Sequence, residues 1–383
     1  MPRKKTAVIV EKVEHYFSVL EDPRIARTRH HELLPLLVMS LAGIICGAEG
    51  WEDLSDFAES KASWLGEIFE LPHGTPSADT FRRVLSSLDP EQFEACFRGW
   101  IQDVASSFKG EVVALDGKSL RGAIDKASRT TPLHLMQVWA TRQRLVLGQV
   151  SVAGAPGEVG AIPKLLALFD LRGAVVTADA NGTTAATTQA VRKAGADYVL
   201  ALKGNRRHQS EDVRARFDSL SKAQLKAAST SVMTNRGHGR VEVRTVHALE
   251  VNDWPFPDWH DVKSVARVIR ERSVEGEDEP SFEAAYYISS LAPDAAELGD
   301  IIRAHWGIEN NLNWCLDIAF REDSRAIRDQ IGAQNFARLA RLALMMVRSE
   351  TTAKKSGRMK RKIAGWDDGY LARILTTGIN PAL

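Results

Sequence analysis

The residues of this chain best suited to do chemistry lie in a late segment, at positions 303–314. Glu309 stands there among polar and aromatic side chains, with His305 four residues before it and Asn313 four residues after it. Because residues four apart share one face of a helix, these three side chains are expected to lie side by side. A core helix would carry aliphatic residues at these positions, so the pattern indicates a polar site.

Two aspartates far upstream are candidate partners of Glu309. Asp116 follows the apolar run 111–115 and Asp179 follows the apolar run 174–178, and each run is expected to be a strand. Carboxylates at the ends of neighbouring strands converge on one edge of a sheet. Three convergent carboxylates stay ionised together only beside a cation. An all-oxygen set without sulfur or clustered histidine favours Mg²⁺ or Mn²⁺.

Such a site would support phosphoryl transfer. Two ions about 4 Å apart clamp the attacking and the leaving oxygen of a phosphodiester, with water or a 3′-hydroxyl as nucleophile. The spacing alone also has a plainer interpretation, because the chain has 49 acidic residues and an aspartate after a strand is most often a turn or a helix cap. The neighbouring Trp306 and Trp314 are likewise more often core residues than platforms for bases.

Composition limits the class of protein. The 383 residues suggest two or three structural units, and the formal net charge of +1 means that nucleic-acid binding would depend on local basic patches. Three scattered cysteines without CxxC spacing argue against a zinc site or a disulfide framework. No signal peptide is visible, and the apolar stretch 33–48 is too short to span a bilayer. We therefore expect a buried helix there and a cytoplasmic protein.

The residue pattern divides the chain into five segments. Residues 1–105 are expected to form a helical, candidate DNA-binding domain, and residues 106–205 three consecutive strands followed by strand–helix repeats. Residues 206–295 have the pattern of a β-rich insertion, and residues 296–350 are again helical. Residues 351–383 form a basic C-terminal tail, whose part 354–362 could grip DNA or be disordered. The strands expected in the insertion are 240–249, 264–272 and 284–291. This order predicts an α/β fold with a mixed sheet flanked by helices.

Motifs along the chain resemble those of a known family. They are Leu115-Asp116-Gly117-Lys118-Ser119-Leu120-Arg121-Gly122, Thr177–Ala180, Asp197–Asn205, Gly237–Glu242 and the block 303–317. Together they are similar to the H-repeat-associated transposases of bacterial insertion sequences, a branch of the DDE transposases, over nearly the whole chain. The resemblance implies a ribonuclease H-like core with a β-rich insertion before the last catalytic helix, in agreement with the expected strand order.

The resemblance also implies roles for individual residues. Asp116, Asp179 and Glu309 become the metal-binding catalytic acids, which would hold Mg²⁺ or Mn²⁺, two ions in all. Candidate phosphate contacts, for which solvated surface charge is the plainer interpretation, are Lys118, Arg121, Lys203, Arg240 and Arg303. Supporting roles are expected for Asn205, His238, His305, Asn310 and Asn313.

The chain departs from the family pattern at several positions, which are Ala78, Ala155, Pro156, Gly157, Asn181, Thr184, Arg206 and Asn313. At residue 313 the family usually has histidine, which can carry charge, whereas asparagine forms hydrogen bonds and stays neutral. Before Glu158 the usual lysine, serine and asparagine are missing, which removes further polar contacts. Changes around metal ligands commonly cost metal affinity or rate.

Three functions are consistent with these observations. The first is a DDE transposase, a nucleoid-associated bacterial homodimer without a membrane partner. It would bind double-stranded DNA at element ends, hydrolyse the boundary phosphodiester with divalent metal ions and join the freed 3′-hydroxyl to target DNA. The second is a diverged or domesticated DNA-binding protein with weak or no catalysis, which the departures from the family pattern favour. The third is a structure-selective nuclease on the same core, which would cut branched DNA without element ends.

Overall fold

A nine-stranded mixed sheet runs through the molecule in the order β3-β2-β1-β4-β5-β9-β8-β7-β6. The computed structural model describes residues 11, 13–123, 132–152, 157–237, 239–274 and 279–377, with the side chain of residue 28 left out. The strands are β1 (Val112–Leu120), β2 (Leu133–Ala140), β3 (Leu145–Val152), β4 (Val175–Ala178), β5 (Asp197–Leu202), β6 (Ser229–Gly237), β7 (Arg240–Glu250), β8 (Ser264–Val274) and β9 (Ser281–Ser289).

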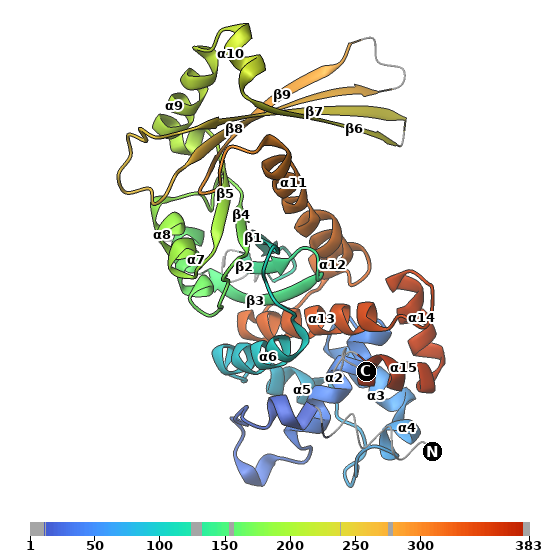
Figure 1. The fold of residues 1–383 in the computed structure, drawn as a ribbon. Helices are drawn as coiled ribbons and strands as arrows, with labels where there is room; N and C mark the ends of the chain where they lie inside the picture. The colour runs from blue at the N-terminus through green and yellow to red at the C-terminus, as the bar shows by residue number, and fades with distance from the viewer. Residues whose placement is uncertain are drawn as a thin grey trace.

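The helices before β1 gather with α13, α14 and α15 at one end of the molecule, and strands β6–β9 form the other end, beside α11 (Figure 1). Before β1 come η1 (Ala26–Thr28), α2 (Leu33–Cys46), α3 (Trp51–Ser60), α4 (Ala62–Gly66), α5 (Ala78–Leu85) and α6 (Pro90–Val104). Between the strands are α7 (Glu158–Leu166), α8 (Ala185–Lys193), η2 (Gly204–Arg206), α9 (Arg207–Asp218) and α10 (Lys222–Ala227). After β9 follow α11 (Ala295–His305), η3 (Ile308–Asn313), α12 (Trp314–Ile318), η4 (Glu322–Ser324), α13 (Gln330–Ser349), α14 (Gly357–Trp366) and α15 (Asp368–Thr377).

The first five strands confirm the predicted α/β fold with a mixed sheet. β1 pairs antiparallel with β2 and parallel with β4, β2 pairs antiparallel with β3, and β4 pairs parallel with β5. One boundary differs from the prediction, because β1 does not stop at Leu115 but continues to Leu120. Asp116 therefore lies inside the strand, opposite Gln137 of β2. Apolar residues marked only the first half of β1, whereas pairing with β2 extends it through the polar residues that follow.

Strands β6–β9 continue the same sheet, with β9 antiparallel to β5. The predicted runs at 240–249, 264–272 and 284–291 correspond to β7, β8 and β9. Strand β6 and the helices α9 and α10 were not predicted from the sequence. Most side chains of β6 are exposed or half-buried, so its residues lack the apolar pattern by which a buried strand is recognised.

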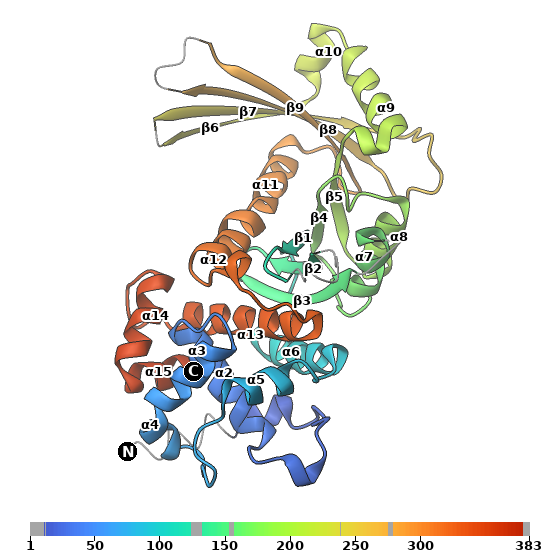
Figure 2. The same cartoon turned by 180° about the vertical axis from the view of Figure 1, so that it is seen from behind.

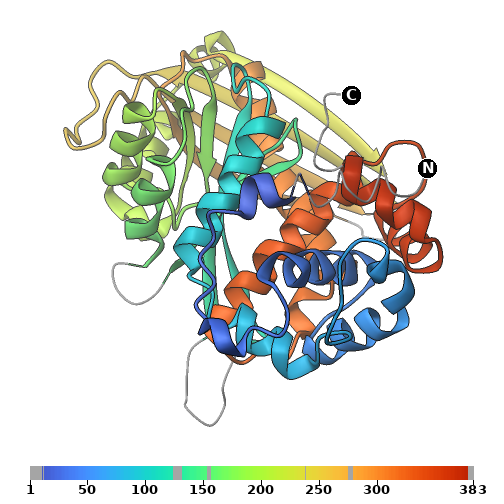
Figure 3. The same cartoon turned by 90° about the horizontal axis from the view of Figure 1, so that it is seen from below.

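Helix α13 lies between the sheet and the N-terminal helices (Figure 2). Of its 20 residues, 16 are buried, since it packs against β2 and β3 on one side and against α2, α5 and α6 on others. A helix covered all round is expected to carry few solvated positions. The N-terminal helices thus share a core with residues from the far end of the chain, as the view from below also shows (Figure 3).

The basic C-terminal segment is folded over residues 357–377, so the expectation of a disordered end is wrong there. Lys360 and Arg361 of α14 are buried. The Arg361 guanidinium donates to the backbone carbonyls of Ile44 and Ile45 at the end of α2, at 2.9 and 3.1 Å. These two cations hold α14 in place and are withdrawn from any role in gripping DNA.

The apolar stretch near the N-terminus is α2, and 10 of its 14 residues are buried, as expected. Over the described residues, no single helix has the length and apolarity to cross a membrane, and α2 meets both criteria only jointly with α3, which is bent from it by 96°. Cys46, Cys96 and Cys315 are free thiols, so the prediction of no disulfide framework is confirmed.

Gly122 is expected to tolerate no side chain. A Cβ at this position would lie 1.7 Å from the backbone carbonyl oxygen of Arg325. We predict that Gly122→Ala lowers the free energy of unfolding by about 2 kcal/mol or more, because backbone must move to relieve the clash. Chemical denaturation measures this change.

The matched control is Gly99→Ala in α6, where a Cβ would meet no atom within 4 Å. Alanine there should leave stability unchanged or raise it by about 0.5–1 kcal/mol, because it favours the helix. Equal stability of the two variants would show that the approach of Gly122 to Arg325 does not constrain the fold.

Candidate active site

The three predicted acids, Asp116, Asp179 and Glu309, line one cavity. The strand register brings the first two together, because Leu115 of β1 pairs with Ala178 of β4 and the next residue of each strand is an aspartate. Glu309 reaches the cavity from the segment that follows α11. Side chains from three separate elements therefore border the same cavity.

Glu309 does not lie in the regular helix that its spacing predicted. α11 ends at His305, and residues 308–313 form a π-helical turn before α12 begins at Trp314. Such turns hold an extra residue, and they occur frequently at functional sites. Asn313 nevertheless faces Glu309, because its Nδ2 donates a hydrogen bond to Glu309 Oε2 at 3.0 Å.

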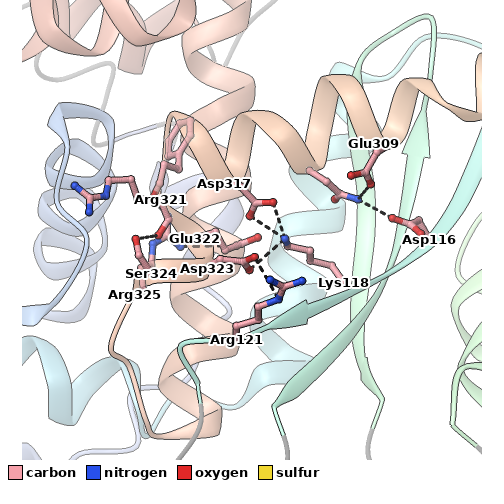
Figure 4. A network of polar contacts seen from close by, with 12 residues as sticks. Asp116, Lys118, Arg121, Glu309, Asp317, Arg321, Glu322, Asp323, Ser324 and Arg325 are labelled. Atoms are coloured by element: carbon pink, nitrogen blue, oxygen red, sulfur yellow. Dashed lines mark hydrogen bonds and ion pairs between the residues drawn. The ribbon is translucent and has the colours of Figure 1, made fainter. Parts of the chain in front are cut away.

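Asn313 also connects Glu309 to Asp116. The same Nδ2 donates to Asp116 Oδ2 at 2.7 Å, so the two carboxylates share one neutral donor, as the dashed lines in Figure 4 show. Burial raises the pKa of Asp116 to about 6, and the negative charges of Glu309 and Asp179 act in the same direction. The Asn313 hydrogen bond opposes this rise, because it favours the ionised carboxylate.

Asp179 combines a structural and a candidate catalytic position. Its Oδ1 accepts a hydrogen bond from the Gly182 backbone N–H at 3.1 Å, which is the turn-capping role that the plainer interpretation expected. Asn205 orients the same loop, since its Nδ2 donates to the Ala180 carbonyl at 2.7 Å. The backbone around Asp179 is thus held from two sides while its carboxylate borders the cavity.

His305 lies beside the acids as a neutral side chain. Its Nδ1 is 2.9 Å from the Thr177 hydroxyl oxygen of β4. Burial lowers the pKa of His305, although the charge of Asp179 opposes the shift. A neutral imidazole held by a threonine can orient its neighbours but adds no positive charge to the cavity.

The carboxylate oxygens of Asp116, Asp179 and Glu309 are of the type that binds hard divalent cations. The three side chains are, however, not close enough together to share one ion. Within the described parts of the chain, no group of three or more histidine, cysteine, aspartate and glutamate side chains lies close enough to hold a metal ion. Oxygen-only ligands are nevertheless those that Mg²⁺ and Mn²⁺ prefer. Burial raises the pKa of Asp116, the charges of Glu309 and Asp179 add to the rise, and a bound cation would oppose it.

Lys118, a predicted phosphate contact, is buried and paired with two aspartates. It is 9% exposed, and its Nζ lies 2.8 Å from both carboxylate oxygens of Asp317 and 3.2 Å from Asp323 Oδ1 (Figure 4). Arg121 is different, because its side chain is 79% exposed and lies 3.7 Å from Asp323. Lys118 therefore ties β1 to α12 and η4, whereas Arg121 stays accessible.

The other candidate cations lie at the cavity or beside it. Lys203 lines the cavity with the acids. Arg240, Arg303 and Asn310 line an adjacent groove between α11 and β6–β7, together with Asn235, Arg236, Gly237, Glu242, Arg244, Trp306 and Gly307. Trp306 borders both the groove and the acid cavity, so the two hollows adjoin.

The arginines in and beside the groove lie close enough for their charges to shift the pKa of Arg244. Burial lowers the pKa of Arg244, and the charges of Arg270 and Arg303 lower it further against the opposing charge of Glu242. Arg270 also lies over the Trp306 ring, 5.5 Å from its centroid. Such a cluster favours anionic ligands.

Several departures from the family pattern have identifiable partners. The Thr184 hydroxyl caps α8 by accepting from the Thr187 N–H at 3.0 Å, and Arg206 Nε donates to the Thr183 carbonyl at 2.7 Å. Gly157 has a φ of 68° where α7 begins. Ala78 opens α5 and Asn181 is exposed. Ala155, Pro156 and the predicted supporting residue His238 lie outside the described residues.

The sequence analysis missed three polar residues that surround the site. His134 of β2 lies 2.6 Å from Glu158 Oε1 and 2.9 Å from the Ser119 hydroxyl, on the strand next to Asp116. Gln137 and Arg341 are fully buried behind Asn313. A glutamine within the apolar run 133–140 was the available signal, because buried polar groups require partners.

Replacing Asp116 by asparagine should stabilise the metal-free protein at neutral pH. The pKa of Asp116 is raised in the folded protein from 3.8 to about 6, so the folded state binds its proton more tightly than the unfolded state does. Stability from this group is lost as the pH rises from about 4 to about 6. Asp116→Asn removes that loss, and should raise the free energy of unfolding at pH 7.5 by about 2 kcal/mol.

Urea unfolding at several pH values with chelator present measures the effect, with Asp300→Asn on the exposed side of α11 as the control. The gain should be largest above pH 6 and shrink as the pH approaches 4. A gain that is the same at pH 5 and pH 7.5 would contradict a raised pKa for Asp116.

Two family models match this chain. Residues 107–346 match the family model described as Transposase DDE domain, and residues 14–101 match the model described as DDE_Tnp_1-associated. The first match spans the sheet, all three acids and most of α13.

Whole-length relatives agree with these matches. The chain is 32% identical over 373 residues to "H repeat-associated putative transposase YhhI" of Escherichia coli strain K12, covering 96% of this chain and 98% of that protein. "Putative protein YbfL" of the same strain has the same identity and coverage. "Putative transposase YncI" of Escherichia coli O157:H7 is 32% identical over 375 residues, with 96% and 95% covered. The chain therefore belongs to the DDE transposases, in the H-repeat-associated branch that its motifs indicated.

Proposed function

We propose that this protein is an active DDE transposase that cuts the phosphodiester at the ends of its element and joins the freed 3′-hydroxyl to target DNA. The observation that carries the proposal is the convergence of Asp116, Asp179 and Glu309 on one cavity that adjoins a groove lined by arginines. Acids alone would repel a phosphate, and cations alone would bind DNA without cutting it. Their adjacency is what a metal-dependent polynucleotidyl transferase needs.

The three acids would hold divalent cations, which supply a nucleophile at neutral pH and neutralise the charge of the reacting phosphate. Asp116 of β1, Glu309 of the π-helical turn and Asp179 of the loop before α8 would supply the carboxylate ligands. Lys203, which is exposed and borders the cavity, would contact the phosphate that is cut. The buried side chains of Ile302 and Ile308 would exclude water from part of the cavity.

A ribonuclease H-like core is part of this proposal. It is supported by the first five strands, in which three antiparallel strands are followed by two parallel ones in the spatial order β3-β2-β1-β4-β5. The strand order places Asp116 at the centre of this half of the sheet and Asp179 on its neighbour. Strands β6–β9 extend the sheet before the segment that carries Glu309, as the β-rich insertion of the family would.

DNA would lie along the groove between α11 and β6–β7. The phosphate contacts that we propose are Lys203, Arg240, Arg244 and Arg303, with Arg121 as an exposed outlying contact. The N-terminal helical region, residues 1–105, would recognise the element ends. Because two ends are joined in one reaction, we propose that the protein acts as a homodimer on DNA.

A second candidate function has a specific observation in its favour. The acids are not gathered tightly enough to hold a metal ion among the described residues, and Asn313 occupies a donor position between two of them. A diverged, transposase-derived protein would bind the same DNA and leave it intact at every concentration of divalent ion. Cleavage of branched DNA without element ends would instead indicate a structure-selective nuclease.

The cleavage assay uses DNA that carries the flanks of the gene, with Mg²⁺ or Mn²⁺, and separates nicked from joined products. We predict metal-dependent cleavage that Glu309→Gln lowers by about 100-fold or more, since even residues that only support metal ligands are worth 10–100-fold. Glu309 is exposed, so this substitution leaves the fold intact.

Glu297→Gln, a change of the same kind on the exposed side of α11, is the control and should cut as well as the wild type. Equal cleavage by the Glu309 and Glu297 variants would overturn the assignment of Glu309. DNA binding without any cleavage by the wild type would establish the second function.

The groove should contribute a salt-dependent part of DNA affinity. Arg240→Gln and Arg303→Gln should each weaken binding and reduce the slope of log affinity against log salt by about 0.9, the value for one phosphate contact. Fluorescence anisotropy between low and moderate salt measures the slope. Arg172→Gln, which removes an exposed arginine paired with Asp170, should change neither quantity, and an equal effect of all three would contradict a localised groove.

A further inference from the structure

A chain of buried polar side chains begins at an ion pair behind the acid cavity. Arg341 of α13 is 0% exposed, and its Nη1 lies 2.8 Å from Glu322 Oε1. Its Nε and Nη2 donate to Gln137 Oε1 at 3.2 and 3.1 Å. Gln137 Nε2 then donates to Asn313 Oδ1 at 2.7 Å, and Asn313 Nδ2 donates to Asp116 and Glu309.

Arg341 determines the donor and acceptor of each hydrogen bond from Gln137 to the acids. A guanidinium has donors and no acceptor, so it requires the oxygen of the Gln137 amide. That leaves the Gln137 nitrogen to face Asn313, which must therefore present its own oxygen. The Asn313 nitrogen is then turned toward the acids. The two amide orientations follow from the arginine and do not depend on how oxygen and nitrogen were assigned.

This arrangement uses both hydrogens of the Asn313 amide. One carboxylate belongs to β1 and the other to the π-helical turn, so a single side chain connects the strand to the turn. The histidine usual in the family would, when neutral, accept from Gln137 with one ring nitrogen and keep one N–H, enough for one carboxylate. Asparagine can serve both acids without adding charge to the site.

We propose that Asn313 is a positioning residue for the metal-binding acids and that Gln137, Arg341 and Glu322 form a relay that aims it. The inference rests on the proposed function, because it concerns how the proposed metal ligands are held. Asn313 binds Asp116 Oδ2 and Glu309 Oε2, which keeps the remaining oxygens of the two carboxylates directed at the cavity. Without the relay the Asn313 amide can turn over, and its oxygen then faces two like charges.

The test removes the relay without touching either acid. Gln137→Met keeps the length of the side chain and loses the donor and the acceptor, so it should weaken Mn²⁺ binding about 10-fold, the effect expected for a partner of a metal ligand. Binding is measured on DNA-free protein by titration calorimetry and by the electron paramagnetic resonance of free Mn²⁺. Neither readout depends on cleavage.

The matched control is Gln149→Met. Gln149 lies directly opposite Gln137 on β3 and is 1% exposed, and its side-chain nitrogen donates to the Gln334 carbonyl at 3.4 Å. It has the same residue type and burial, and among the described residues its side chain forms no hydrogen bond to Gln137, Arg341, Glu322 or Asn313. Its replacement should leave Mn²⁺ affinity unchanged, whatever it does to the melting temperature.

A double-mutant cycle tests whether Gln137 acts through Asn313. Asn313→Ala should weaken Mn²⁺ binding about 10-fold, and adding Gln137→Met to it should weaken binding no further, because coupled residues are not additive. Asn313→Ala also carries the test by itself if Gln137→Met does not fold. In that case an unchanged affinity would overturn the proposal.

The outcomes separate the relay from the metal site. Equal effects of the Gln137 and Gln149 variants, or additive effects of Gln137→Met and Asn313→Ala, would overturn the relay and leave the metal site standing. A wild-type protein with no saturable Mn²⁺ binding would overturn the metal site, and the relay with it. A tenfold loss confined to the Gln137 and Asn313 variants supports the proposal.

Discussion

The placement of three carboxylates around one partly buried cavity is the constraint on which the rest of this structure depends. Two of the acids are placed by the register of β1 and β4, and the third by a π-helical turn. Burial makes Asp116 costly to ionise, and the charges of Glu309 and Asp179 add to that cost, so its pKa is raised. The neutral amide of Asn313 offsets part of that cost by donating hydrogen bonds. The arginines lie in the adjacent groove and not in the acid cavity. A cation placed directly against the acids would neutralise them, but it would also compete with any metal ion.

Keeping that donor in place requires a rigid support, which α13 provides. Arg341 on this helix starts the chain of bonds to Asn313, and one turn earlier Arg338 pairs with Glu94 of α6 at 2.7 Å. Glu94 also accepts from the Gln149 backbone N–H of β3 at 2.8 Å. Buried ion pairs add little net stability, but they can specify one arrangement over others. The N-terminal helices, the sheet and the acid cavity are therefore coupled through a single helix.

Much of this site could be predicted from residue types and order, whereas its boundaries and partners could not. Apolar runs in the sequence predicted the strands β1–β5. The aspartates placed after two of these runs predicted residues that line the cavity. The extension of β1 past Asp116 escaped prediction because it depends on pairing with β2, a contact between distant residues. Lys118 appeared to be a surface cation because the sequence does not show that Asp317 and Asp323 fold against it. The π-helical turn has no periodicity of its own to recognise.

The departures from the family pattern bear on whether the site has decayed. Decay would leave buried polar groups without partners, because nothing would select a replacement that fits. Instead Thr184 caps α8, Arg206 bonds the Thr183 carbonyl, and Asn313 satisfies one glutamine and two acids at once. These three replacements each have hydrogen-bond partners in the fold. These hydrogen bonds are what a site would have if its surroundings changed while its acids were kept. They argue against a site that has decayed.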